Sequence, residues 1–135
     1  MTRVIDPTPE SFRSLSRDVP ADVPIVMLNL LRFRDEAAYP SGSEHSACSG
    51  REAYARYGAH AFSAVKAAGG EVVFAGSALA YPIAPPDERW DEVLLVAYPS
   101  VRAFFQMVMA PDYQAQSVHR TAALLDARLI CTQRS

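Results

Sequence analysis

The sequence lacks several features that would assign a function directly. Its 135 residues contain no run of about 18 apolar residues, so no membrane span is expected. The start, MTRVIDPTPE, lacks the apolar segment of a signal peptide, and we expect a cytoplasmic protein. The formal net charge is −2 and no basic stripe is interleaved with aromatic residues, which argues against nucleic-acid binding. A glycine-rich phosphate loop, a nucleophile elbow and an HExxH motif are also absent.

Cysteine is scarce as well, since Cys48 and Cys131 are the only two and lie far apart in the chain. Their spacing fits neither a metal site nor a redox motif, which favours two free thiols in a reducing compartment. His45 and Cys48 form an H-x-x-C pair in a polar loop, but two ligands are too few for a zinc site. We therefore expect no metal and no other cofactor.

Three segments are apolar without the alternation that marks a strand with one wet face. They are 23–31 (VPIVMLNLL), 71–80 (EVVFAGSALA) and 93–98 (VLLVAY). Such strands are typically buried on both faces. The helical segments suffice for about one layer over a small sheet, so the second face needs another cover. A second copy of the chain is the simplest cover, which predicts a homodimer.

Capping residues and apolar periodicity locate the other elements. The predicted helix caps are Thr8, Ser49 and Ser100. The predicted helices follow these caps over about 9–19, 50–68 and 101–124, the last with a break at Pro111. The predicted strands lie at about 23–33, 71–81, 91–98 and 127–132.

This order, a short helix and then β-α-β-β-α-β, is the split βαβ or ferredoxin-like arrangement. Right-handed crossovers put both main helices on one face of a four-stranded antiparallel sheet. Two such sheets facing each other would form a dimeric α+β barrel. We expect one α+β domain, 1–135, in which 1–22 is an N-terminal helix extension and 23–132 is the ferredoxin-like unit.

Four segments carry a resemblance to a known family: MLNLLRFR (27–34), SGREAYARYG (49–58), ERWDEVLLVAYPS (88–100) and PDYQAQSVHRTAALLDARLI (111–130). They resemble small bacterial dimeric α+β-barrel proteins classed as a domain of unknown function. The resemblance implies a ferredoxin-like protomer and a homodimer, but no known reaction. The wider superfamily includes cofactor-independent monooxygenases, isomerases, haem enzymes and proteins without assigned activity, so fold alone does not choose among them.

Asn29 and Arg32 are polar residues of the first strand segment. A buried amide needs hydrogen-bond partners, so Asn29 either lines a pocket between sheet and helices or bonds to a neighbouring loop. Arg32 lies three residues on, which puts it on the opposite face of a regular strand. It either binds a carboxylate near the strand end or, as we favour, pairs with a surface acid such as Glu36.

Four aromatic residues are further candidates for substrate binding. Tyr54 and Tyr57 lie on the apolar stripe of the 50–68 helix, where they serve either as core residues or as hydroxyl groups of a pocket. Trp90 and Tyr98 share the parity of Leu94 and are candidate pocket walls. For Trp90 a packing or dimer-interface role is the favoured alternative.

His119 and Arg120 are adjacent on the last helical segment. Histidine is the usual general base near neutral pH, and arginine holds anionic groups. A solvated helix face is the alternative for at least one of them. Arg120 follows Tyr113 by seven residues on the same helical stripe, which predicts that Arg120 is the more inward of the two.

The first functional hypothesis is a cofactor-independent enzyme, monooxygenase-like or isomerase-like, acting on a small organic molecule. The pocket would lie between sheet and helices beneath a lid formed by residues 34–50, with His119 as base, Asn29 stabilising an oxyanion and Arg120 holding an acidic group. This mechanism requires these side chains to converge on one cavity. The alternative is a non-catalytic small-molecule-binding or stress-related dimer. Haem binding through His119 is a third, weaker hypothesis.

Overall fold

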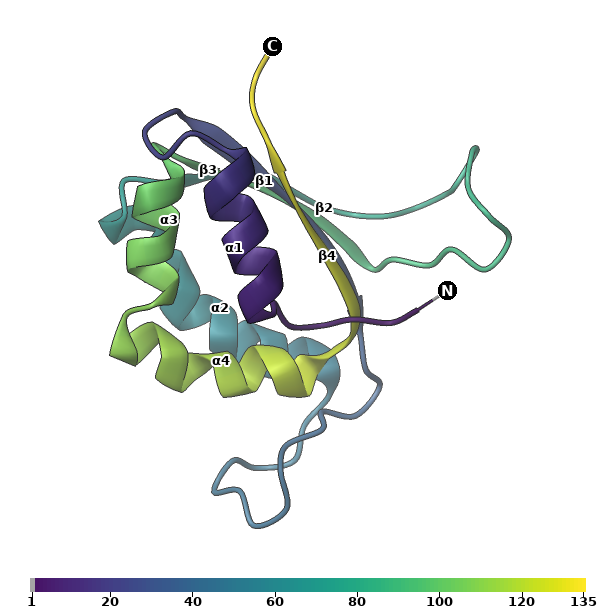
Figure 1. The fold of residues 1–135 in the computed structure, drawn as a ribbon. Helices are drawn as coiled ribbons and strands as arrows, with labels where there is room; N and C mark the ends of the chain where they lie inside the picture. The colour runs from purple at the N-terminus through teal and green to yellow at the C-terminus, as the bar shows by residue number, and fades with distance from the viewer. Residues whose placement is uncertain (1) are drawn as a thin grey trace.

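The computed structural model describes residues 2–135, which form four helices and four strands (Figure 1). Their bounds are α1 Pro9–Asp18, β1 Ile25–Phe33, α2 Gly50–Ala67, β2 Glu71–Ser77, β3 Glu92–Tyr98, α3 Val101–Val108, α4 Pro111–Ala123 and β4 Leu124–Thr132. The strands pair antiparallel in the order β2-β3-β1-β4. The helices gather on one face of this sheet (Figure 1). The predicted ferredoxin-like α+β fold is therefore confirmed.

The three predicted helix caps are confirmed. The Thr8 side chain accepts a hydrogen bond from the Ser11 amide, and the Ser49 side chain accepts one from the Glu52 amide. Ser100 caps α3 in the same way. These contacts satisfy backbone N–H groups that a helix leaves without intrahelical partners. Among residues 2–135, no helix combines the length and the apolarity needed to cross a bilayer.

Two strand boundaries differ from the prediction. β2 ends at Ser77 rather than near residue 81, because the hairpin that follows it diverges from β3 after the Ser77–Glu92 pair (Figure 1). β4 begins at Leu124 rather than near residue 127, because Leu124 already has extended backbone angles and pairs with Phe33. The turn from α4 into β4 therefore needs no connecting loop.

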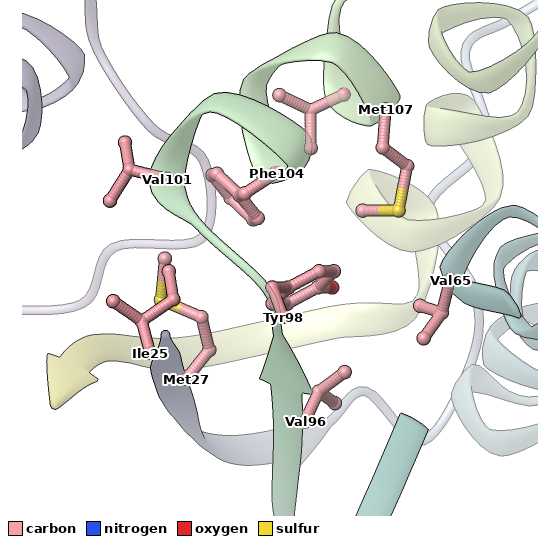
Figure 2. Close-up of a cluster of buried hydrophobic side chains, with 9 residues drawn as sticks. Ile25, Met27, Val65, Val96, Tyr98, Val101, Phe104 and Met107 are labelled. Atoms are coloured by element: carbon pink, nitrogen blue, oxygen red, sulfur yellow. The ribbon is translucent and has the colours of Figure 1, made fainter. Parts of the chain in front are cut away.

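The hydrophobic core lies between the inner face of the sheet and the helices. Figure 2 shows Tyr98 of β3 beneath Phe104 of α3, with Val65 of α2 to the right of it. The Tyr98 and Phe104 rings meet edge to face, with centroids 5.3 Å apart. Helix α1 has no fully buried residue but packs on this core through Phe12, whose ring lies 5.3 Å from that of Phe105.

The outer face of the sheet has no helix over it (Figure 1), and its centre is apolar. One row crosses all four strands in register: Phe74, Leu95, Leu28 and Ile130. Phe74 and Ile130, at the two ends of this row, are 52% and 47% exposed. The strands thus lack alternating polar residues for two reasons. The inner face of the sheet forms the core, and the row across the outer face is apolar although no helix covers it.

Candidate functional site

A cavity of about 880 Å³ lies between the inner face of the sheet and helices α1, α2 and α4. Its apolar walls include Phe12 and Leu15 of α1, Val65 of α2 and Leu94 of β3. The polar side chains that line it include Asn29, Glu92, Arg120 and the tyrosines 54, 57, 98 and 113. This size and mixture are typical of sites for small organic ligands.

The N-terminal segment and α1, rather than the loop after β1, cover the cavity. Val4, Ile5 and Pro7 line it, whereas residues 34–50 do not. The Ala127 amide donates to the Val4 carbonyl (2.7 Å) and holds this segment along β4. The predicted lid of residues 34–50 is therefore wrong. That loop instead bonds to itself and to the end of α4, where the Ala38 amide donates to the Ala122 carbonyl (2.8 Å).

Tyr57 of α2 and Tyr113 of α4 share a hydrogen bond between their hydroxyl groups across the cavity wall. Tyr54, one helical turn before Tyr57, stacks against it with ring centroids 5.3 Å apart. The three rings form a continuous aromatic wall, since Tyr57 and Tyr113 also meet edge to face.

Burial raises the pKa of Tyr54, Tyr57 and Tyr113 above the ordinary value of a phenol. The pKa of Tyr98 is raised as well, first by burial and then by Tyr57. All four hydroxyl groups are consequently protonated at neutral pH. They can donate hydrogen bonds to a ligand oxygen, but they are poor bases.

The hydroxyl groups of Tyr54 and Tyr98 are available to a ligand. Within residues 2–135 neither hydroxyl has a hydrogen-bond partner, and no side-chain oxygen or nitrogen is buried without one. These two oxygens are therefore not sealed in the core, and the cavity is the open space that both residues line.

Asn29 faces the cavity from the middle of β1. Its Nδ2 donates to the carbonyls of Met27 (3.4 Å) and Leu94 (3.3 Å), and both contacts are long. Its Oδ1 has no partner among residues 2–135 and can accept a hydrogen bond. Asn29 therefore lines the cavity, and the partners of its amide are strand carbonyls rather than the neighbouring loop of the alternative interpretation.

Glu92 and Tyr113 line the cavity although the sequence reasoning did not select them. A signal existed for Glu92, which shares the strand parity of Leu94 and Val96 and therefore faces inward. A signal exists for Tyr113 too, because it lies seven residues before Arg120 on the same helical stripe.

His119 lies outside the cavity, which overturns the predicted convergence of His119 with Asn29. It is 7% exposed and packs under the 34–49 loop, where its Nδ1 lies 2.7 Å from the Tyr39 hydroxyl. Its ring centroid is 4.5 Å from that of His45. Burial, with smaller contributions from His45 and Arg56, holds the pKa of His119 below its ordinary value. Arg120, the next residue, is the one that faces the cavity.

Trp90 and Arg32 are likewise not cavity residues. Trp90 is buried, its Nε1 donates to Glu88 (2.6 Å), and the guanidinium of Arg128 lies 5.2 Å from its ring. It is therefore a packing residue in the protomer rather than a cavity wall. Arg32 lies in register with Asp126 on the outer face, opposite to Asn29 as predicted. Among residues 2–135 Arg32 forms no ion pair, so the predicted pair with Glu36 is absent.

The residues that the structure describes, 2–135, contain no group of three or more histidine, cysteine, aspartate or glutamate side chains placed to hold a metal ion. His45 and Cys48 remain an isolated pair in the loop, and both cysteines are free.

The fold and cavity define a ferredoxin-like α+β protein, and comparison with known families gives its relatives. Residues 44–133 match the family described as a domain of unknown function, DUF1330. The chain belongs to this family, which confirms the resemblance found in the sequence. A comparison with curated proteins found no match.

Two solved structures of RPA0582 are similar over nearly the whole chain. The methylated RPA0582 protein is 42% identical, with a TM-score of 0.91, and the match covers 100% of this chain and 97% of that one. The other structure, of a protein of unknown function from Rhodopseudomonas palustris, is 41% identical, with a TM-score of 0.90 and coverages of 99% and 98%.

A hydroxynitrile lyase from Passiflora edulis is a more distant structural neighbour. It is 11% identical, with a TM-score of 0.55, and the match covers 84% of this chain and 95% of that chain. At this identity the likeness shows a shared fold alone.

Proposed function

We propose that the chain binds a small carbonyl compound in the inner cavity and catalyses proton transfer on it without a cofactor. The observation that carries this proposal is the chemistry of the cavity lining. Two carboxylates line it, those of Asp6 and Glu92. Asp6 accepts a hydrogen bond from Thr121, whereas Glu92 has no ion pair within residues 2–135. Glu92 therefore stands as a free acceptor among tyrosine hydroxyls that burial keeps protonated.

In the proposed step, Glu92 takes a proton from the carbon beside the ligand carbonyl. The C–H electron pair moves into an enolate, and the Tyr57–Tyr113 pair donates a hydrogen bond to the enolate oxygen. Where the ligand carries a β,γ double bond, the enolate is a dienolate and protonated Glu92 returns the proton to its γ carbon. The product is then the conjugated isomer, and no co-reactant is needed. In this proposal Asn29 orients the ligand. Its position is diagonal to that of Glu92 across β1 and β3, which corresponds to a Cα–Cα separation of about 7–8 Å.

The test is deuterium exchange into phenylacetone, whose α-protons a carboxylate can remove, followed by NMR in D₂O. We expect the protein to accelerate exchange over buffer, Glu92→Gln to abolish the acceleration, and Tyr113→Phe to reduce it by about 10-fold or more. Glu10→Gln, on the exposed surface of α1, is the matched control and should keep the full rate. An unaccelerated exchange with the wild-type protein, or full activity in Glu92→Gln, would refute catalysis by this residue.

The second candidate is a non-catalytic small-molecule-binding protein. The placement of His119 outside the cavity favours it, because the cavity then lacks the side chain best suited to proton transfer at neutral pH. Native mass spectrometry of the protein as purified tests it, in combination with the exchange assay. A bound small molecule without any acceleration of exchange would support binding alone.

We also propose that the outer face of the sheet pairs with the same face of a second copy. The row Phe74–Leu95–Leu28–Ile130 supplies an apolar surface that no helix covers, and Leu79 and Ile83 of the β2–β3 hairpin are 91% and 98% exposed. Large exposed apolar patches of this kind are typical of interfaces. The dimer would act in the cytoplasm, where the two free cysteines stay reduced.

Light scattering coupled to size-exclusion chromatography tests the dimer. We expect a mass of two chains for the wild-type protein and of one chain for Ile130→Glu, which puts a charge in the proposed interface. Met109→Glu is the matched control, since Met109 is 63% exposed at the end of α3, away from the outer face. A dimer that survives Ile130→Glu unchanged would argue against this surface.

A further inference from the structure

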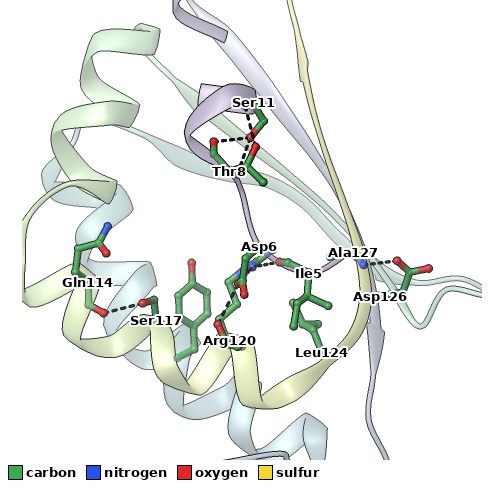
Figure 3. A network of polar contacts seen from close by, with 12 residues as sticks. Ile5, Asp6, Thr8, Ser11, Gln114, Ser117, Arg120, Leu124, Asp126 and Ala127 are labelled. Atoms are coloured by element: carbon green, nitrogen blue, oxygen red, sulfur yellow. Dashed lines mark hydrogen bonds and ion pairs between the residues drawn. The ribbon is translucent and has the colours of Figure 1, made fainter. Parts of the chain in front are cut away.

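The guanidinium of Arg120 lies between the N-terminal segment and the cavity. Its Nη1 donates to the Ile5 carbonyl (2.5 Å) and lies 3.5 Å from Asp6 Oδ1 (Figure 3). Within residues 2–135, neither Nε nor Nη2 has a hydrogen-bond partner, and no side-chain nitrogen is sealed without one. The side chain is only 18% exposed and lines the cavity. One edge of the guanidinium is therefore occupied, and the other is free toward the cavity.

The positive charge of Arg120 is incompletely neutralised. Asp6 is half exposed and its oxygen lies 3.5 Å from Nη1, so solvent screens much of this pair. The charge of Arg120 acts instead on the aromatic wall. Burial raises the pKa of Tyr57 and Tyr113, and Arg120 opposes this increase at both hydroxyls. The guanidinium thus acts on the protonated hydroxyl groups that the proposed function uses, and all three residues line the same cavity.

The other charges of the cavity favour a ligand with a single negative charge. Arg128, the second cation in the lining, is already paired with Asp126 at 2.6 Å. Glu92 brings a free negative charge to the same cavity and would repel a dianion. Of the two cations, Arg120 is the one that keeps a donor edge without an acceptor among residues 2–135, and a planar carboxylate matches this Nε–Nη2 edge with two parallel hydrogen bonds.

We infer that the ligand of this cavity is a monocarboxylate with an apolar body, and that its carboxylate binds the Nε–Nη2 edge of Arg120. This inference rests on the proposed function, because it names the class of molecule that the same cavity takes. Phe12, Leu15 and Val65 surround the apolar body.

The same arginine couples the ligand to the N-terminal segment. A carboxylate on Nε and Nη2 fixes the guanidinium in the orientation in which Nη1 reaches Ile5 and Asp6. Asp6 is also held by Thr121, whose hydroxyl donates to it at 3.0 Å. Ligand binding therefore stabilises the segment over the cavity, and trypsin should cleave the exposed Arg3–Val4 bond more slowly in the complex.

The test compares binding of 4-phenylbutanoate, 4-phenylbutan-1-ol and the dianionic 4-phenylbutyl phosphate by isothermal titration calorimetry. We expect the carboxylate to bind at least about 10-fold more tightly than the alcohol and more tightly than the phosphate. Arg120→Met should remove the preference over the alcohol, and Arg120→Lys should keep part of it. Arg13→Met, on the surface of α1, is the matched control and should behave as the wild type. Circular dichroism of each variant establishes that it is folded.

The outcomes separate this inference from the proposed function. Equal binding of the acid and the alcohol overturns the carboxylate assignment and leaves cavity binding intact. An acid preference that persists in a folded Arg120→Met variant also overturns it. Faster tryptic cleavage after Arg3 in the presence of 4-phenylbutanoate would show that the ligand displaces Asp6 and would refute the coupling. Binding of none of the three probes, together with no accelerated exchange into phenylacetone, would overturn the proposed function and this inference with it.

Discussion

Gly50, the first residue of α2, is predicted to be the least replaceable glycine of the chain. A Cβ at this position would overlap the carbonyl oxygen of Arg34 and lie 2.7 Å from that of Ala123. Both neighbours are backbone atoms, so no side-chain rotation relieves the contact. The approach is needed because the Gly50 amide donates to Arg34 (3.1 Å) and the Arg34 amide donates to Ala123 (2.9 Å), which joins α2, β1 and α4.

The magnitude follows from two opposing effects in Gly50→Ala. Overpacking against backbone costs about 1–3 kcal/mol, and weakening of the Gly50–Arg34 hydrogen bond adds about 1 kcal/mol. The higher helix propensity of alanine offsets at most about 1 kcal/mol of this loss in stability. We expect a net loss of about 1–3 kcal/mol in the free energy of unfolding. With a urea dependence of about 1.5 kcal/mol/M, the unfolding midpoint falls by about 0.7–2 M.

Gly58→Ala is the matched control, because it lies within the same helix and an added Cβ meets nothing within 4 Å. The gain in helix propensity alone should stabilise this variant by about 0.5–1 kcal/mol. The two alanine variants should thus move the urea midpoint in opposite directions. A Gly50→Ala variant as stable as Gly58→Ala would refute the argument that close backbone approach fixes glycine at position 50.

Three further predictions concern stability. Burial holds the pKa of His119 below its ordinary value of 6.5, so the unfolded chain takes up a proton first. Stability should fall as the pH drops through about 6.5 and level off below the folded-state pKa, and urea midpoints of His119→Gln should lack this component. Asp126→Asn weakens the acceptor of the Val4 amide and removes the ion pair of Arg128, and thermal unfolding should show a loss of about 2 kcal/mol in the free energy of unfolding. Phe12→Ala should lower the free energy of unfolding by about 2 kcal/mol in the same measurement, because this half-buried ring packs α1 on the core. An unchanged unfolding midpoint would mean that α1 does not pack on the core.

The helix caps and the fold could be predicted because their signals are local. Thr8, Ser49 and Ser100 cap through contacts within three residues, and the apolar periodicity of each helix is read within a short window. The strand order then follows from the element order and the handedness of the crossovers. The start of β4 was missed because Leu124 continues the apolar pattern of α4 while its backbone is already extended.

The candidate site was only partly predictable because its decisive contacts span the chain. Arg120 meets Ile5 across 115 residues, and no local pattern indicates that the N-terminal segment closes the cavity. The helical stripe from Tyr113 correctly favoured Arg120 over His119 as the inward residue. The environment of His119 depends on Tyr39, which lies in a loop without periodicity and is therefore not placed by sequence reasoning.

The inner and outer faces of the sheet differ in where polar residues occur. This difference distinguishes the face proposed to bind a ligand from the face proposed to bind a second copy of the chain. On the inner face, Asn29 of β1 and Glu92 of β3 lie in adjacent rows, beside the end of the sheet that the N-terminal segment crosses. On the outer face, the row through Leu28 carries no polar side chain on any strand. A polar side chain that faces a core persists only where it has a partner. Asn29 bonds to strand carbonyls with one end of its amide. Among residues 2–135, its other end and the Glu92 carboxylate both lack partners, which supports a ligand on the inner face and a protein partner on the outer one.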